Sequence, residues 1–289
     1  MKYLSLLLLL SSLILFSCKD NNEPEQKNAS DQLLSSITSP SSVEEYSYDD
    51  LNRVVKWSYS GGSIRYAAEY DYSSKDIIII NASETYMIGN EMVEDSKYEE
   101  SVYLDSEGKA KYAEGVWTYS NTNISGLKKK YRNSFEFDFS NELVLFECEE
   151  WYIDRSDNPM ITTIKFEWEN SLIKSCVRSY GSSESSRIIN YKYTNINNSV
   201  NNPITYPVVL KSYYIALYLN GRLGKLPRLL VAEKDINDIY QNEHCIYKYT
   251  YSIDADGFVN EYRQEAQYLN HSDIISNDAY QVLWKPSTK

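Results

Sequence analysis

Hydrophobic and polar positions alternate over residues 247–253, the clearest pattern in the chain. Tyrosine or isoleucine occupies every second position from Tyr247 to Ile253, with lysine, threonine and serine between them. Because successive side chains of a β-strand point to opposite faces, this spacing predicts a strand with one buried face. Residues 254–257, Asp-Ala-Asp-Gly, supply turn chemistry, since aspartate bonds its own backbone and glycine accepts a positive φ. Residues 258–268 then form the antiparallel partner.

Looser copies of this hairpin recur from residue 43 to residue 285, at intervals too variable for a strict repeat. They predict an all-β fold of about fifteen strands in a single large antiparallel meander. A flat sheet of that size would leave long unpaired edges, so we expect a closed barrel or a curved half-barrel. No linker interrupts the series, which indicates one antiparallel β domain over residues 43–289.

Residues 207–220 depart from the alternation because they are apolar on nearly every side. Pro207 suits a first helical turn, and Asn220 followed by Gly221 suits a helix end. We therefore expect one short buried helix near 207–220 that covers the sheet or plugs one end of it. A buried strand is the alternative, because periodicity does not separate the two here.

The N-terminal residues have the pattern of a leader rather than of a folded element. Residues 1–3 make a short basic start, and residues 4–16 are almost purely apolar, too short to span a bilayer where ~20 residues are needed. Residues 15–18, Leu-Phe-Ser-Cys, resemble the lipobox of bacterial lipoproteins. The resemblance implies a signal peptide over residues 1–17 and acylation of Cys18, which anchors the chain in a membrane. A plain secretory signal with an incidental Cys18 is the alternative.

Residues 18–42 are acidic and then serine-rich, and we expect them to form a disordered tether. Residues 19–25 also resemble the acidic signal that sends some lipoproteins of Gram-negative bacteria to the cell surface. We therefore expect a lipid anchor in the outer membrane with display at the cell surface, the periplasmic face being the alternative.

Net charge and cysteine spacing limit the partners and the disulfides that we expect. The formal net charge is −12, and removing the leader takes away Lys2, so the mature chain is more negative still. Nucleic-acid partners are not expected, because their binding needs clustered cations. The strand at residues 161–168 would hold Cys148 and Cys176 ~9.5 Å apart, beyond disulfide reach, so we expect buried free thiols there and at Cys245.

No catalytic, metal or cofactor site emerges from the polar residues. The two histidines, His244 and His271, have no G-x-S-x-G partner motif. Glu147 and Glu149 would lie ~6.5–7 Å apart on one strand face, a spacing compatible with a glycoside hydrolase, but two glutamates on any solvated strand face meet it. Residues 254–257 overlap the start of a calcium loop without its remaining ligands, and a hairpin turn explains them.

Aromatic residues are the most suggestive feature of the composition, with 28 tyrosines and 5 tryptophans. All five tryptophans lie in predicted strands: Trp57, Trp117, Trp151, Trp168 and Trp284. On a concave sheet their rings would bind a glycan or line a groove for a lipid-like ligand. The alternative is that they fill the interior of the curved sheet.

The acylated leader, the Y-x-Y-D-x-x-N/G hairpins and the stretch at residues 219–227 (LNGRLGKLP) occur together. The combination is similar to a family of bacterial outer-membrane or surface lipoproteins of unknown function, which the resemblance implies has a porin-like antiparallel β fold. The hairpins alone also resemble YD repeats. The family brings no activity, so we expect a non-catalytic binding or scaffold protein with an envelope protein as partner. The alternatives are a carrier of a glycan or lipid-like ligand and, third, a carboxylate-based glycoside hydrolase.

Overall fold

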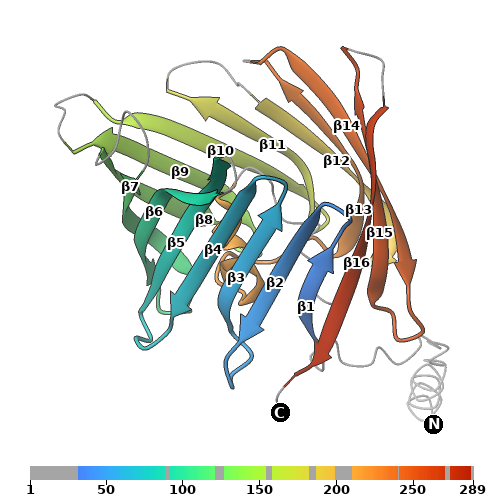
Figure 1. Cartoon of the computed structure of the whole chain (residues 1–289), viewed down its shortest axis with the longest axis horizontal. Helices are drawn as coiled ribbons and strands as arrows, with labels where there is room; N and C mark the ends of the chain where they lie inside the picture. The colour runs from blue at the N-terminus through green and yellow to red at the C-terminus, as the bar shows by residue number, and fades with distance from the viewer. Residues whose placement is uncertain are drawn as a thin grey trace, which may run out of the picture.

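A single antiparallel sheet closes on itself to form the molecule (Figure 1). The computed structural model describes residues 32–88, 91–120, 127–153, 158–181, 187–198, 210–239, 241–270 and 274–287. Each strand pairs with its neighbours in the chain, and β1 closes the ring by pairing with β16. The predicted meander is therefore confirmed, and of its two expected forms the closed barrel is the one observed.

The barrel has sixteen strands. Their bounds are β1 Gln32–Thr38, β2 Ser42–Tyr48, β3 Val54–Gly61, β4 Ile64–Asp71, β5 Ile77–Ile88, β6 Glu91–Leu104, β7 Ala110–Tyr119, β8 Lys128–Phe137, β9 Leu143–Tyr152, β10 Met160–Glu169, β11 Leu172–Tyr180, β12 Arg187–Asn197, β13 Leu229–Asp238, β14 Glu243–Ile253, β15 Val259–Tyr268 and β16 Ile274–Pro286.

Aspartate-led turns make the tight hairpins at one rim of this barrel. In the turn after β14, Asp254 Oδ1 accepts the backbone N–H of Asp256 at 3.0 Å and that of Phe258 at 2.9 Å. Gly257 takes the positive φ of 91° that closes the turn. Three further turns use the same acceptor pattern: those of Asp49, Asp105 and Asp138. Side-chain acceptors thus satisfy turn amides that have no strand partner.

The disordered tether predicted for residues 18–42 extends too far toward the C-terminus. Residues 32–38, placed in the tether of residues 18–42 by the sequence, form β1, which pairs with both β16 and β2. A β-bulge between Leu34 and Ser36 shifts the register, so the buried side chains are Leu34 and Ile37. That spacing hides the period of two by which a strand is recognised. The expected signal peptide, Cys18 and the rest of the tether lie outside the described residues.

The wall of the barrel is apolar and aromatic inside and charged outside. In β8, Tyr131 and Phe135 are buried, whereas Lys130 and Arg132 on either side of Tyr131 are exposed. Ion pairs link neighbouring strands on the outer face, with Lys56 Nζ 2.6 Å from a carboxylate oxygen of Glu69, for example. The large buried core cluster lies on the inner side of the wall, because alternate positions of each strand face the lumen.

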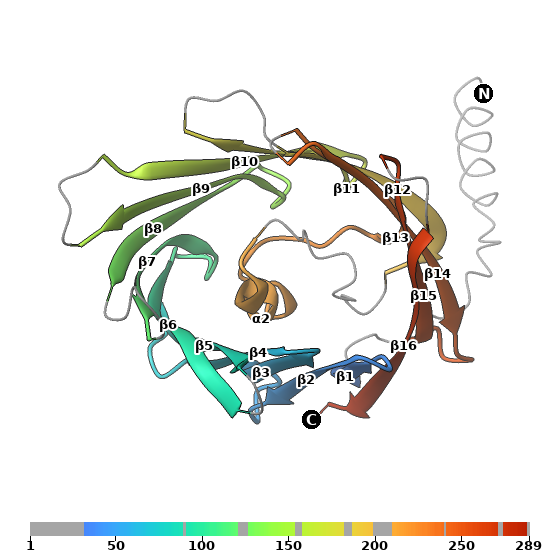
Figure 2. The ribbon, with the colours of Figure 1, turned by 45° about the horizontal axis from the view of Figure 1, so that its top comes forward.

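A segment between β12 and β13 enters the lumen (Figure 2). It contains the 3₁₀ turn η4, Ser212–Tyr214, and the helix α2, Ile215–Leu219, and Figure 2 shows α2 encircled by the strands. The predicted short buried helix is confirmed in the form of a plug, although residues 207–209 lie outside the described part. No helix in the described ranges is long and apolar enough to cross a bilayer.

Candidate functional site

A buried carboxyl group, Glu100 of β6, fastens the plug to the wall. Tyr131 of β8 donates its hydroxyl hydrogen to Glu100 Oε2 at 2.7 Å, and Tyr213 of the plug donates to the same oxygen at 2.9 Å. Tyr214 donates to Oε1, and its hydroxyl oxygen accepts the side-chain N–H of Asn133. Glu100 is 2% exposed, so these donors replace the water that the carboxyl group loses on folding. We call these five residues the Glu100 hub.

Lys211 adds a cation beside the Glu100 hub. Its Nζ lies 3.6 Å from Glu100 Oε2 and 3.2 Å from the ring centroid of Tyr131. A buried carboxyl group with three hydroxyl donors and an adjacent ammonium group is compensated by both hydrogen bonds and charge. The hub therefore ties the plug to β6 and β8 inside the lumen, which makes it a structural centre.

An aromatic cavity of about 260 Å³ lies beside the plug. Two stacked pairs border it, Trp57 with Tyr66 at 6.5 Å and Trp117 with Tyr98 at 5.0 Å between ring centroids. Glu84 lies between them and accepts the hydroxyl hydrogen of Tyr98 at 3.5 Å. Rings with an acidic group among them suit a sugar-like ligand, because rings cover C–H faces and the carboxylate accepts hydroxyls.

The five tryptophans that the sequence suggests as ligand-binding residues lie in three different environments. Trp57 and Trp117 share the aromatic cavity. Trp168 and Trp284 pack against the core and donate their indole N–H groups to backbone carbonyls, each at 2.8 Å. Trp151 lies on the outward parity of β9, opposite the exposed Lys130 of β8. The five rings therefore do not form one platform, and their role in ligand binding stays a prediction, with Trp57 and Trp117 as the pair that shares a cavity.

Trp57 also belongs to a partly buried polar cluster with Glu44. Its indole N–H donates to Glu44 Oε1 at 2.7 Å, and the Tyr46 hydroxyl donates to the same oxygen at 2.5 Å. Burial raises the pKa of the Glu44 carboxyl group, and the two hydrogen bonds oppose that shift. The Trp57 ring is thus held rigidly at the cavity wall.

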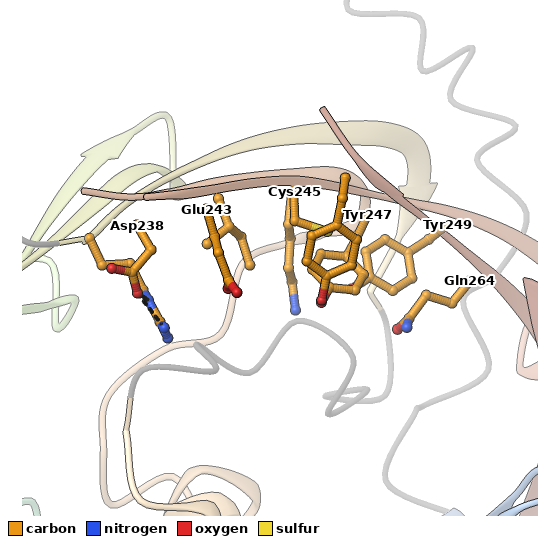
Figure 3. Close-up of a pocket in the computed structure, with 10 residues that line it drawn as sticks. Asp238, Glu243, Cys245, Tyr247, Tyr249 and Gln264 are labelled. Atoms are coloured by element: carbon orange, nitrogen blue, oxygen red, sulfur yellow. Dashed lines mark hydrogen bonds and ion pairs between the residues drawn. The ribbon is translucent and has the colours of Figure 1, made fainter. Parts of the chain in front are cut away.

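A second cavity, of about 300 Å³, lies against the inner face of β12 to β15 (Figure 3). Figure 3 shows Asp238, Glu243, Cys245, Tyr247 and Gln264 pointing to the same side of the sheet. The complete lining is Arg187, Lys234, Ile236, Asp238, Glu243, Cys245, Tyr247, Tyr249, Gln264 and Tyr268. We call this space the Lys234 cavity.

Charged side chains of both signs line the Lys234 cavity. Arg187 donates to Asp238 Oδ2 from Nε at 2.8 Å and from Nη2 at 2.6 Å, and Asp238 Oδ1 accepts the backbone N–H of Gln241. Lys234 is 3% exposed, and its Nζ lies 5.4 Å from the ring centroid of Tyr249. Burial lowers the pKa of the Lys234 amine to about 8. A desolvated amine in a cavity wall is a common feature of binding and reactive sites.

The sequence does not reveal that Lys234 faces the lumen, because charged and apolar residues do not alternate around it. Residues 233–238 read Glu-Lys-Asp-Ile-Asn-Asp, so charged side chains occur at both odd and even positions. Only Ile236, whose parity Lys234 and Asp238 share, indicates the inner face. Glu100 follows Glu99 and is hidden for the same reason.

Other residues singled out by the sequence lie away from these cavities. Glu147 and Glu149 are on the outward parity of β9, which does not support a carboxylate pair in a cleft. His244 Nε2 lies 2.6 Å from Asp235 Oδ1 on the outer face, and His271 is outside the described residues. Cys148, Cys176 and Cys245 are free and buried, and β10 separates the first two as expected. Within the described ranges no group of His, Cys, Asp or Glu is arranged to hold a metal ion.

The closed antiparallel sheet of sixteen strands is a porin-like barrel, and two solved structures resemble it. One is a porin-like protein from Bacteroides uniformis ATCC 8492, with a TM-score of 0.53 and 13% identity over 89% of this chain and 96% of that chain. The other is a porin-like protein from Bacteroides vulgatus ATCC 8482, with a TM-score of 0.57 and 13% identity over 88% of this chain and 98% of that chain. No family model and no curated protein sequence matches the chain.

These likenesses confirm the porin-like fold expected from the sequence. At this level of identity they concern the fold alone. Membership of the lipoprotein family, acylation of Cys18 and the location in the outer membrane stay predictions.

Proposed function

We propose that the protein is a lipid-anchored, non-catalytic binding protein of the bacterial envelope, whose barrel stands in water and holds a small ligand in its lumen. The inverted polarity of the wall carries this proposal. A barrel that crosses a bilayer presents an apolar band about 25 Å tall to the lipid, flanked by aromatic girdles. Here the buried aromatic residues face the lumen, and charged residues such as Lys130 and Arg132 face outward.

Ion pairs on the outer face occur around the ring rather than in one patch. They bridge β3 to β4 (Lys56 and Glu69), β7 to β8 (Glu114 and Arg132), β10 to β11 (Glu167 and Lys174), and β12 to β13 (Lys192 and Glu233). A lysine or arginine on the lipid face near the bilayer midplane costs about 2–4 kcal/mol. Such a wall supports contact with water, and the lipid on Cys18 then supplies the membrane attachment.

The interior of the barrel supports the binding of a ligand rather than the passive diffusion of solutes through the lumen. The plug lies inside the ring of strands (Figure 2), tied to the wall by the Glu100 hub, and the aromatic cavity and the Lys234 cavity also lie on the inner side of the wall. Cavities of this size, lined by rings and a few polar groups, are typical of small-molecule sites. The carrier alternative from the sequence is thereby favoured over the scaffold.

Native mass spectrometry of the gently purified full chain tests the binding function. We expect an excess mass that denaturation removes, because a ligand enclosed by the barrel dissociates slowly. A bare mass in preparations taken directly from the native envelope would refute the binding function.

A further inference from the structure

The aromatic cavity forms where two rows of side chains cross strands β3 to β7 on the lumen face. The strand register aligns the first row as Trp57, Ala68, Ala82, Tyr98 and Trp117, and the second as Tyr59, Tyr66, Glu84, Ser96 and Tyr119. Aromatic rings stand on both sides of β5, which carries Ala82 in the first row and Glu84 in the second. Because opposed side chains of neighbouring strands lie within contact distance, the small Ala82 leaves a gap between two aromatic walls.

The plug closes this gap on the side of the lumen. Ser212 and Tyr213 line the cavity together with the wall, and the Tyr213 ring centroid lies 5.6 Å from that of Tyr98. Tyr213 is itself fixed by its hydrogen bond to Glu100. The walls and the roof are therefore in place before a ligand enters, and such preorganisation lowers the entropic cost of binding.

Glu84 is a buried carboxyl group whose two oxygens are unequally bonded. It is 9% exposed and lines the cavity. Tyr86 donates to Oε1 at 2.5 Å, whereas Ser96 and Tyr98 reach Oε2 only at 3.4 Å and 3.5 Å. Hydrogen bonds between a hydroxyl group and an oxygen are normally ~2.5–3.0 Å long, so Oε2 has room for a closer donor. A ligand in the cavity can supply that donor.

The charge around the cavity is negative overall. Besides Glu84, the lining contains Glu150 and Lys211. Each has a partner of opposite charge, because Lys129 Nζ lies 3.7 Å from Glu150 Oε2 and Glu100 Oε2 lies 3.6 Å from Lys211 Nζ. Three carboxylates thus face two ammonium groups. In the described part of the chain Glu84 is bonded by hydroxyl groups alone, so a cationic donor is favoured at its free side.

The aromatic walls suit both a cation and a sugar ring. Lys129 Nζ lies 5.1 Å from the ring centroid of Trp117, so this wall already attracts one ammonium group. Aromatic faces also cover the C–H groups of a sugar. The volume of about 260 Å³ lies just below the ~300–1,000 Å³ of most ligand pockets, which suits a single ring better than a long chain.

We propose that the aromatic cavity binds a monosaccharide amine, with its ammonium group on Glu84 Oε2 and its ring between the Trp57 and Trp117 walls. The proposal rests on the proposed lumen-binding function and names the ligand class. The ammonium group supplies a close, charged donor to Glu84, and the rings cover the C–H faces of the sugar. The Lys234 cavity takes no part.

The first test compares glucosamine with glucose, which has a hydroxyl group in place of the amine, and with ethanolamine, which has the amine but no ring. Isothermal titration calorimetry on the full chain in mild detergent is run at about pH 6.5, where the sugar amine is protonated. Glucosamine should bind about tenfold or more tightly than either probe. Equal affinities for glucosamine and glucose would overturn the role of the charge, and an equal affinity for ethanolamine would overturn the role of the ring.

Substitution of Glu84 tests the charged contact. Glu84→Gln keeps the shape of the side chain and should abolish the preference for glucosamine over glucose. Glu69→Gln is the matched control, because Glu69 lies on the outward parity of β4 with its carboxylate 2.6 Å from Lys56 Nζ. A thermal melt of each variant shows that it is folded. A preference for glucosamine that survives in folded Glu84→Gln would overturn the assignment.

Substitution of Trp117 tests the ring contact independently. Its indole N–H has no hydrogen-bond partner among the described residues, so Trp117→Leu removes the aromatic face without breaking a hydrogen bond. The variant should bind glucosamine and glucose about fivefold more weakly and keep the ratio between them. Trp151→Leu, on the outward parity of β9, is the control and should bind both as the parent does. Unchanged affinities in Trp117→Leu contradict the ring contact.

Native mass spectrometry separates the failure of this ligand class from the failure of the binding function. If the native chain carries a cargo but glucosamine is not preferred, the ligand class is wrong and the lumen-binding function stands. If the chain is bare and binds neither sugar, both proposals fail.

Discussion

Removing the buried charge of Lys234 should stabilise the protein at neutral pH. The amine titrates near 10.5 in an exposed chain and at about 8 in the barrel. Each unit of pKa difference corresponds to about 1.36 kcal/mol, so the protonated amine costs about 3 kcal/mol of folding free energy at pH 7. Lys234→Met removes this cost, and we expect the variant to be more stable than the parent by up to that amount.

The sign of the pH dependence follows from proton binding. Between pH 8 and 10.5 the unfolded chain holds the Lys234 proton and the folded chain has released it. Stability of the parent therefore rises with pH over this window, relative to Lys234→Met, and the difference between the two narrows. Below pH 8 the difference is at its largest. Tyrosine and cysteine ionisation affects both proteins alike and cancels in the comparison.

Guanidinium unfolding of both proteins at pH 7, 8, 9 and 10 measures this difference. Lys192→Met is the control, because an exposed lysine in a surface ion pair contributes little, and its substitution should change stability by less than about 0.5 kcal/mol at every pH. A Lys234→Met variant that is less stable at pH 7, with a difference that stays constant to pH 10, would refute the reasoning. Such a result would mean that neighbouring groups compensate the buried charge fully.

Three further outcomes are expected. Tyr214→Phe should lower the free energy of unfolding in urea by about 1.5–3 kcal/mol, because the Tyr214 hydroxyl donates to a buried carboxyl group. The loss should exceed that of Tyr251→Phe, which removes a bond to a neutral carbonyl. Equal losses would contradict the role of the Glu100 hub. Asp254→Ala should cost about 1 kcal/mol by leaving two turn amides without their acceptor, and an unchanged unfolding midpoint would show otherwise. Burial raises the pKa of Cys148 and Cys176 to about 12, so both thiols should resist a disulfide reagent at pH 8 until urea unfolds the chain. Rapid labelling of the native protein would disprove their burial.

Local patterns predicted the strands and the plug because each is determined by nearby residues. The period of two around Tyr249 and the aspartate-led turns give the meander directly. Residues 207–220 stood out by being apolar all round, and a buried segment inside a barrel has that composition. The sequence did not decide between a closed barrel and a half-barrel, because closure depends on β1. The β-bulge in β1 disguises the alternation that Leu34 and Ile37 would otherwise show.

The candidate site was harder to predict because it depends on which face of each strand is the inner one. Charged residues occur at both parities around Lys234 and Glu100, so neither could be assigned to the lumen from the sequence. The grouping of the tryptophans also depends on the face: strand parity sends Trp151 outward, while Trp57 and Trp117 line one cavity. Long-range register, rather than local pattern, sets these contacts.

We propose that the barrel faces water and that the lipid on Cys18 makes its membrane contact. Fractionation of cells expressing Cys18→Ala, with the leader cleavage site otherwise intact, tests this most directly. We predict that the variant leaves the membrane fraction and remains a folded barrel without detergent, as judged by circular dichroism and a cooperative melt. Retention of the variant in the bilayer after alkaline washing would contradict the account, because the wall itself would then be in contact with lipid.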